Sequence, residues 1–335
     1  MRELQTIEGY SSVLSIKDTQ KAIKLLKDTF SRELSLALNL DRVSAPFIVR
    51  KGSGINDDLN GVERKVEFDM KEIEGTAEVV QSLAKWKRAA LKKYGYEPGE
   101  GIYTDMNAIR RDDDCDNVHS IFVDQWDWER VICKEDRTVE FLKSIVIKII
   151  GAIDETQQIL HAAFPQLKNE LATDVCFITT QELEDKYPDL TPKERENALL
   201  KEHGVAFIMQ IGSVLKSGIK HDGRAPDYDD WALNGDLMFW NETLQRAFEI
   251  SSMGIRVDAE SLKYQLKVCD AEDRLAFDYH KGIIDGTLPL SIGGGIGQSR
   301  LSMLLLEKAH IGEVQVSLWP EAMIEKCREN GIILL

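Results

Sequence analysis

The residues best suited to chemistry gather first in the stretch SIGGGIGQSRLSMLLLEK, residues 291–308. Four glycines in five positions precede Arg300, at the point where an apolar helix is expected to begin. Two familiar glycine motifs do not fit, because Gln298 stands where a dinucleotide-binding motif needs glycine and Arg300 replaces the lysine of a phosphate-binding loop. The glycines indicate that something approaches this backbone closely. That neighbour is either a packed strand and helix or a ligand.

A second group of polar residues lies on a predicted strand, IFVDQWDWERVI, at residues 121–132. Side chains alternate between the two faces of a strand. One face would carry the mostly polar set Val123, Gln125, Asp127 and Glu129. The other would carry Asp124, Trp126 and Trp128. Amide and carboxylate groups in the concave face of a sheet suit a small polar ligand, and a solvated edge strand is the alternative.

The preceding strand, residues 101–110, ends in Arg110 and Arg111. A guanidinium beside a polar strand face can contact a phosphate or a carboxylate through two parallel hydrogen bonds, and it can also stack on a flat ring. The alternative is an ion pair with the neighbouring acidic run at residues 112–114. For a single arginine considered alone, the ion pair is the more common arrangement.

Acidic and basic residues elsewhere could complete such a site. Asp236 and Glu249 fall on two predicted strands, and if these strands are adjacent their carboxylates would converge as magnesium with a nucleotide phosphate requires. Unrelated surface acids are the alternative in so acidic a chain. Lys85 and Lys87 lie two apart on a predicted helix, so at most one of them should enter a site.

Composition excludes several classes of protein. The net charge of −15 disfavours wide contact with nucleic acid. The five cysteines form no CxxC pair, and the six histidines are scattered, so neither a disulfide framework nor zinc chemistry is expected. No GxSxG motif occurs. The N-terminus is polar and the most apolar run is short, so no signal peptide or membrane span is expected and a cytoplasmic protein is predicted.

The elements that must position these residues can be read from the pattern of apolar side chains. Helices are expected at 18–39, with Asp18 as its cap, at 82–95, at about 137–164, and from Thr191. Two further helices should precede the glycine stretch and one should follow it. Strands are expected at 42–50, interrupted by Pro46, and at 65–70, 101–110, 121–132, 174–179, 205–212, 236–240, 247–257 and 313–319. This order predicts an α+β protein with a mostly antiparallel sheet, forming a single domain over residues 1–335.

Taken in order, these segments resemble the catalytic core of class II aminoacyl-tRNA synthetases. AIRR…VHSIFVDQWDWE resembles the second motif of that class, and GGGIGQSRL resembles the third. The closer resemblance is to ammonia-dependent (A-type) asparagine synthetases, the aspartate–ammonia ligases. It is carried by seven segments in order: GSGINDDLNG, VVQSLAKWKR, GEGIYTDMNAIR, VDQWDWERV, RAPDYDDW, EISSMGIRVDA and GGGIGQSRL. The chain departs from better-known members at its N-terminus, in a shorter stretch between DDW and NGD, and at Ser53 and Asp58 of the first loop.

The resemblance implies a class II synthetase-like antiparallel sheet flanked by helices, without an anticodon-binding domain. It implies that ATP and Mg²⁺ are used to join L-aspartate and ammonia into L-asparagine through β-aspartyl-AMP, with release of AMP and pyrophosphate. It also implies a homodimer that binds neither nucleic acid nor membranes. Such a site works mainly by positioning its substrates and stabilising charge.

Roles for individual residues follow from the same resemblance. Arg110 would contact the α-phosphate and act in catalysis, and Arg300 would stack on adenine. Gly295, Gly297 and Glu249 would complete the nucleotide site, and Asp236 with Glu249 would hold magnesium. The amino acid would be bound by Ser82, Lys87, Gln125, Asp127, Ser252 and Arg256. Either Asp57 or Asp229 would remove a proton from ammonium, or would hold the substrate amine instead.

Two other functions compete with this interpretation. An aspartyl- or asparaginyl-tRNA synthetase should carry an anticodon-binding module, yet only about seventeen residues precede the first predicted helix and the charge opposes RNA. A non-catalytic relative of the synthetases should lack the arginines or the metal-binding acids, and all of them are present here.

Overall fold

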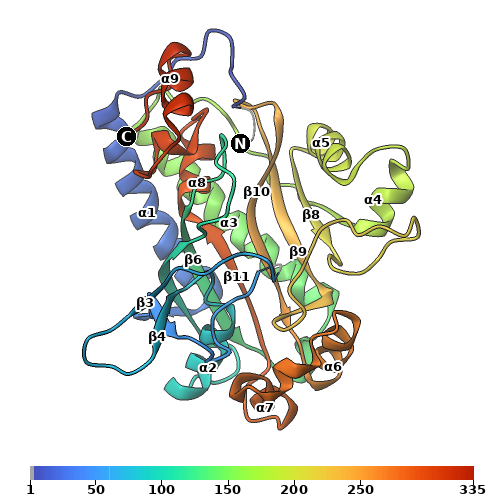
Figure 1. Cartoon of the computed structure of the whole chain (residues 1–335). Helices are drawn as coiled ribbons and strands as arrows, with labels where there is room; N and C mark the ends of the chain where they lie inside the picture. Colours follow the sequence, from blue (N-terminus) through green and yellow to red (C-terminus); the bar gives the residue numbers. More distant parts are fainter. Residues whose placement is uncertain (1–3, 60) are drawn as a thin grey trace.

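A computed structural model describes residues 4–59 and 61–335, and an eight-stranded sheet forms its centre (Figure 1). Its strands, in spatial order, are β1 (Leu40–Arg42), β5 (Gly101–Ile109), β6 (Phe122–Val131), β11 (Ser291–Gly297), β10 (Arg246–Arg256), β9 (Asp229–Asn241), β8 (Val205–Met209) and β7 (Cys176–Thr179). The pairs at the two edges, β1 with β5 and β7 with β8, are parallel. The other pairs are antiparallel, which confirms the mostly antiparallel sheet that the sequence predicted.

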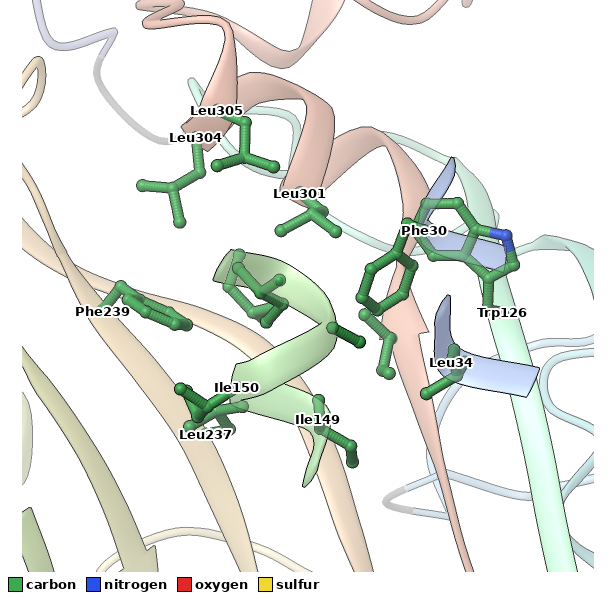
Figure 2. Close-up of a cluster of buried hydrophobic side chains, with 14 of the residues drawn as sticks. Phe30, Leu34, Trp126, Ile149, Ile150, Leu237, Phe239, Leu301, Leu304 and Leu305 are labelled. Atoms are coloured by element: carbon green, nitrogen blue, oxygen red, sulfur yellow. The ribbon is translucent and has the colours of Figure 1, made fainter. Parts of the chain in front are cut away.

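Two long helices, α1 (Ile16–Leu38) and α3 (Val139–Ala163), lie against each other and cover one face of the sheet (Figure 1). The helical spacing of Leu26, Phe30 and Leu34 in α1 turns all three into the main hydrophobic core. Figure 2 shows Phe30 beside Trp126 of β6, and the centroids of these two rings are 4.6 Å apart. One face of the sheet is therefore filled by apolar side chains, which leaves the other face for polar ones.

The glycine-rich strand β11 joins the two halves of the sheet. It pairs with β6 of the β5–β6 hairpin on one side and with β10 on the other. Gly295 lies opposite both Asp127 and Ser252, so the side chains of those two residues share one face of the sheet. This register places residues from three distant parts of the chain side by side.

A smaller sheet lies next to the main one and carries the first glycine-containing loop. Its strands are β2 (Ile48–Arg50), β4 (Thr76–Val79) and β3 (Glu67–Asp69). The loop between β2 and β3 contains Asp57. Helix α2 (Ala84–Tyr94) follows β4 and ends at Gly95, close to the predicted bounds.

The remaining helices lie around the sheet. They are α4 (Thr180–Lys186), α5 (Pro192–His203), α6 (Ala259–Val268), α7 (Asp278–Ile284), α8 (Gln298–Leu305) and α9 (Glu321–Glu329). Short 3₁₀ turns occur at Lys134–Asp136, Glu272–Ala276 and Ile311–Glu313. Helix α5 begins as predicted, with Thr191 and Glu194 forming a capping box around Pro192. Within residues 4–59 and 61–335, no helix is both long and apolar enough to cross a bilayer.

One predicted strand, at residues 313–319, is wrong. The segment forms a 3₁₀ turn that ends at Glu313 and then an irregular stretch. The Glu313 carboxylate accepts hydrogen bonds from the amides of Ala309 and His310, which holds the chain in a turn. Val316 and Leu318 are left 72% and 78% exposed, although their alternation is typical of a half-buried strand.

Other boundaries also differ from the sequence prediction. The predicted strand at 42–50 is two strands in two different sheets, β1 and β2, because the chain changes direction around Pro46, which cannot donate to a ladder. Strand β9 begins at Asp229, whereas the sequence predicted this strand to begin at residue 236. Helix α1 is capped by Ser15, whose side chain accepts a hydrogen bond from the amide of Asp18, and not by Asp18 itself.

Candidate active site

A cavity of about 710 Å³ opens on the polar face of the main sheet. This volume is typical of a site for a small ligand. Of the residues singled out from the sequence, it is lined by Asp57, Ser82, Lys87, Arg110, Gln125, Asp127, Asp229, Glu249, Ser252, Arg256, Gly295, Gly297 and Arg300. The fold therefore brings these residues to one place, although they come from both halves of the chain.

Two arginines line this cavity from different elements. Arg110 directly follows β5, and its Nε and Nη2 lie 3.4 Å from the carbonyl oxygen of Gln81. Arg300 lies on α8, and its Nη1 donates to the carbonyl oxygen of Glu249 at 3.2 Å. The ion pair with the acidic run, considered for Arg110, is made by Arg64 with Asp112 instead. Arg110 is thus held by weak contacts and faces the cavity.

A β-bulge in β10 decides which of its side chains face the cavity. The register between β10 and β9 shifts between Glu249 and Ser251. Strict alternation would place Glu249 and Ser252 on opposite faces, but the extra residue in the bulge returns both to the same face. Glu249, Ser252 and Arg256 all line the cavity as a result.

The floor of the cavity holds a network of buried charges. Arg256 donates to Glu129 through Nη2 at 2.7 Å and through Nε at 3.0 Å, and its Nη1 is ion-paired with Asp229. Lys87 is ion-paired with Asp127 and also donates to the carbonyl oxygen of Gly294 at 2.9 Å. Each of these side chains is at most 4% exposed. The network satisfies charges that would be costly to bury alone.

These neighbours shift the pKa values of the network. Burial raises the pKa of Glu129, but Arg256 and Lys87 outweigh it and hold that pKa below its usual value. Burial lowers the pKa of Lys87, and the nearby charge of Arg256 lowers it further, against the opposing effects of Asp127 and Glu129. Burial also raises the pKa of Asp229.

The glycines of β11 are required by the protein's own side chains. A Cβ atom at Gly293 would overlap the Glu129 carboxylate and lie 2.6 Å from Arg256 Nη2. One at Gly295 would collide with the amide of Gln125, and one at Gly297 would press on the side chain of Arg300. The sequence left open whether the close neighbour is packed protein or a ligand, and the observed neighbours are charged and polar side chains at and below the cavity floor.

The two aspartates considered for proton removal differ in their surroundings. The Oδ1 of Asp57 accepts from the amide of Leu59 at 2.9 Å, and its buried Oδ2 has no hydrogen-bond partner among the described residues. Asp229 is held by Arg256. Between them lies Tyr228, whose pKa is raised by burial and by the negative charges of both. Asp57 thus has no ion-pair partner among the described residues, whereas Asp229 is paired with Arg256.

The predicted magnesium carboxylates lie on the same face of neighbouring strands. Asp236 lies opposite Ser252, and Glu249 lies beyond the bulge on the same strand as Ser252. Burial and the charge of Glu249 raise the pKa of Asp236 to about 6. However, Asp236 is ion-paired with Arg224 from the loop between β8 and β9. Within the described parts of the chain, no group of three or more His, Cys, Asp or Glu side chains is arranged to hold a metal ion by itself.

The side chains of the two lysines on α2 point to different places, as their spacing predicted. Lys87 lines the cavity, whereas Lys85 is ion-paired with Asp227 at 3.2 Å, below the first loop. Asp227 also binds Arg274 and His280. Lys85 therefore supports the loop and does not enter the cavity floor.

Several lining residues were missed in the sequence. They are His119, Phe122 and Tyr228. Arg224, which pairs with Asp236 and is not among the lining residues, was missed as well, although it and Tyr228 stand inside the segment RAPDYDDW. That segment was a usable signal, because its four charged residues cannot all be solvated in so short a loop over a sheet.

Solved structures identify the class of the fold. Asparaginyl-tRNA synthetase from Entamoeba histolytica in complex with asparaginyl-adenylate matches with a TM-score of 0.62 and 15% identity, over 90% of this chain and 66% of that one. Asparaginyl-tRNA synthetase from Pyrococcus horikoshii, also complexed with asparaginyl-adenylate, matches with a TM-score of 0.62 and 15% identity, over 91% and 70% of the two chains. The fold is that of a class II aminoacyl-tRNA synthetase catalytic core.

Sequence relatives identify the family within that class. The family model for aspartate–ammonia ligase matches residues 17–331. The aspartate–ammonia ligase of Ruminiclostridium cellulolyticum is 60% identical over the full length of both chains, and that of Levilactobacillus brevis is 57% identical over 98% of each. The chain belongs to the aspartate–ammonia ligase family, which is a family of enzymes.

Proposed function

We propose that this enzyme converts L-aspartate, ammonia and ATP into L-asparagine, AMP and pyrophosphate through β-aspartyl-AMP. The observation that carries the proposal is that Arg110 and Arg300 line one cavity together with the buried Lys87–Asp127 and Arg256–Glu129 pairs. Such a cavity offers cations for phosphates beside a charged site for an amino acid. Family membership supports the same reaction.

The reaction needs activation because a carboxylate anion repels a nucleophile and hydroxide is a poor leaving group. The side-chain carboxylate of aspartate attacks the α-phosphorus of ATP, and the bond from that phosphorus to pyrophosphate breaks. Arg110 stabilises the charge that develops on the α-phosphate, and Arg300 covers the adenine ring beside Gly297. Gly295 and Glu249 complete the nucleotide site.

The amino acid is bound by the network on the cavity floor. Asp127 has a buried Oδ2 without a partner among the described residues, which suits it to accept a hydrogen bond from the α-ammonium group of aspartate. Lys87 and Arg256 attract the carboxylates of the substrate, and Ser82, Gln125 and Ser252 supply uncharged contacts. This network is formed before substrate arrives, which reduces the cost of ordering it.

Asp57 is the better candidate for the proton acceptor in the second step. Ammonia attacks the acyl carbon of the adenylate, AMP leaves, and the proton shed by ammonium must go to a nearby base. Asp57 lines the cavity with a free carboxylate oxygen, whereas Asp229 is committed to Arg256.

Mg²⁺ is the metal that this site would take, since Asp236 and Glu249 provide two hard oxygen ligands on one face of the sheet. Two carboxylates without a third suit a cation that also binds substrate phosphates. When bound, Mg²⁺ would neutralise phosphate charge.

The assay that tests this function combines the purified protein with ATP, MgCl₂, aspartate and ammonium chloride, and follows AMP and asparagine together. Formation of both in equal amounts is expected. If neither forms, while aspartate or asparagine is transferred to tRNA, the assignment moves to a tRNA synthetase. If neither reaction occurs and ATP still binds, the chain is a non-catalytic relative.

We infer further that the chain is one catalytic domain and acts in the cytoplasm as a homodimer that binds no nucleic acid. The terminal segments pack together, since Leu4 shares a hydrophobic cluster with Met323 and Cys327. The net charge of −15 opposes RNA binding. Leu36 on α1 and Phe47 beside β2 are 72% and 49% exposed, which suits an apolar contact with a second copy.

Light scattering on the eluting protein tests the dimer, which should have twice the chain mass. Leu36→Asp combined with Phe47→Asp should yield monomers. Tyr264→Asp is the matched control, because Tyr264 is 63% exposed on α6. Dimers that survive the double substitution would place the interface elsewhere.

A further inference from the structure

The loop between β8 and β9 places a guanidinium group where a metal ion would bind. Arg224 is ion-paired with Asp236, and its side chain is only 13% exposed. The Asp236 side chain is 10% exposed, whereas that of Glu249 is 36% exposed. The carboxylate that should share a cation with Glu249 is therefore covered by Arg224.

The contacts of Arg224 are few for so buried a side chain. Besides Asp236, it donates through Nη1 to the carbonyl oxygen of its own neighbour Gly223 at 2.8 Å. Its buried Nε has no hydrogen-bond partner among the described residues. An arginine with five donors that uses so few of them is held mainly by charge, so it can be displaced by a stronger cation.

The electrostatic surroundings explain why a cation is needed at this position. Asp236, Glu249 and Asp222 all act on Arg224, and they raise its pKa although burial lowers it. Without Arg224, the buried carboxylate of Asp236 would lie beside Glu249 with no counter-ion of its own, since Arg300 is paired with Glu249, and an uncompensated buried charge is destabilising. Arg224 is therefore the counter-ion of Asp236, while Arg300, whose Nη1 lies 3.5 Å from Glu249, serves the second carboxylate.

We infer that Arg224 is a displaceable counter-ion that competes with the divalent cation for Asp236. This inference deepens the proposed function, because it rests on the proposed role of Asp236 and Glu249 in binding magnesium. A guanidinium and a metal ion cannot occupy the same carboxylate oxygen, so the free enzyme binds divalent cations weakly. A nucleotide supplies the phosphates that a displaced guanidinium can bind. Arg224 is thus a positioning residue, which makes cation binding depend on the nucleotide.

The test measures Mn²⁺ binding to the full chain without nucleotide, using the electron paramagnetic resonance signal of free Mn²⁺. Arg224→Gln should bind Mn²⁺ at least about tenfold more tightly than the unmodified chain, since a nearby positive charge is gone. The double variant Arg224→Gln with Asp236→Asn should lose this gain. Arg195→Gln is the matched control, because Arg195 is ion-paired with Glu184 at similar burial but away from the cavity.

Equal or weaker Mn²⁺ binding by a folded Arg224→Gln variant would overturn the inference. Thermal melting checks folding, and Arg224→Met, which keeps the apolar stem, replaces a variant that does not fold. The experiments distinguish failure of the role inferred for Arg224 from failure of the proposed reaction. Unchanged Mn²⁺ binding in an enzyme that still makes asparagine rejects only the role of Arg224. Tighter Mn²⁺ binding in a chain that makes no asparagine rejects only the reaction.

Discussion

Glu129 on β6 and Arg256 on β10 are joined through a two-point ion pair that passes over the strand between them. The shorter of the two hydrogen bonds is 2.7 Å, and β11 has Gly293 directly below the pair. The pair is almost completely buried, and Ser291 donates to the same carboxylate at 2.7 Å. Because it crosses the central strand, it fixes the spacing of the cavity floor.

This crossing makes Gly293 intolerant of any side chain. Gly293→Ala should destabilise the chain by more than about 2 kcal/mol, because the added methyl group overlaps the Glu129 carboxylate and cannot be relieved without breaking the pair. Gly151→Ala in α3 is the matched control, since nothing lies within 4 Å of the added atom. It should stabilise the chain by about 0.5–1 kcal/mol. Urea unfolding of both variants measures this, and equal effects would refute the argument.

Replacing Arg110 should stop adenylate formation without unfolding the chain. Arg110→Ala is expected to lower the rate of aspartate-dependent ATP–pyrophosphate exchange by about 10²–10³-fold, as loss of a preorganised donor to a developing charge does elsewhere. Its structural contacts are two long hydrogen bonds of 3.4 Å, so the melting temperature should barely change. Arg111→Ala, at an exposed neighbouring position, is the control. Near-normal exchange in Arg110→Ala would remove that residue from the proposed role.

Asp57 should matter for the second half-reaction and not for the first. Asp57→Asn is expected to lower the rate of asparagine formation about 10²-fold with ammonium while retaining ATP–pyrophosphate exchange. Hydroxylamine, which is largely unprotonated at neutral pH, should restore product formation as the hydroxamate. Asp229→Asn should impair both half-reactions, because Asp229 is ion-paired with Arg256. Loss of exchange in Asp57→Asn would instead assign Asp57 to binding the substrate.

The stability of the chain should fall in mild acid because of His310. Burial lowers the pKa of His310 to about 4, and its Nδ1 accepts a hydrogen bond from the amide of Gly312 at 3.0 Å. Between pH 6.5 and 4 the unfolded chain binds the proton that the folded chain excludes. The neutral ring therefore contributes its full stability above pH 6.5, and this is lost by about 1.4 kcal/mol per pH unit as the pH falls toward 4.

His310→Asn provides the comparison, because its Oδ1 can accept the same hydrogen bond without titrating. Free energies of unfolding at pH 7 and pH 5, from urea titration, should differ less in this variant than in the unmodified chain. Equal pH dependence in the two proteins would show that other groups are responsible.

Much of the site could be predicted from the sequence because it depends on local alternation. Gln125 and Asp127 share a face of β6 for that reason, and both line the cavity. Glu129 lies on the same face but is completely covered by Arg256, which no local pattern reveals. The bulge in β10 could not be predicted from the sequence either, because it follows from the pairing of β10 with β9 and not from the residues of β10 alone.

The ion pair of Arg224 with Asp236 is another feature that the sequence did not predict. The two residues lie in a predicted loop and a predicted strand, and only the fold of the loop over the sheet brings them together. The segment at 313–319 alternates like a strand, but the Glu313 carboxylate binds the amides of Ala309 and His310 and holds the chain in a turn, which the alternation does not reveal. Tertiary context overrode local preference in each case.

The position of β11 has a consequence for how the protein is made. Residues 291–297 are translated after both β6 and β10, yet they form the strand on which β6 and β10 both pair. A nascent chain that ends earlier holds two unconnected half-sheets, each with an open edge able to pair with other chains. Emergence of β11 from the ribosome is therefore the step at which the two halves of the main sheet can join.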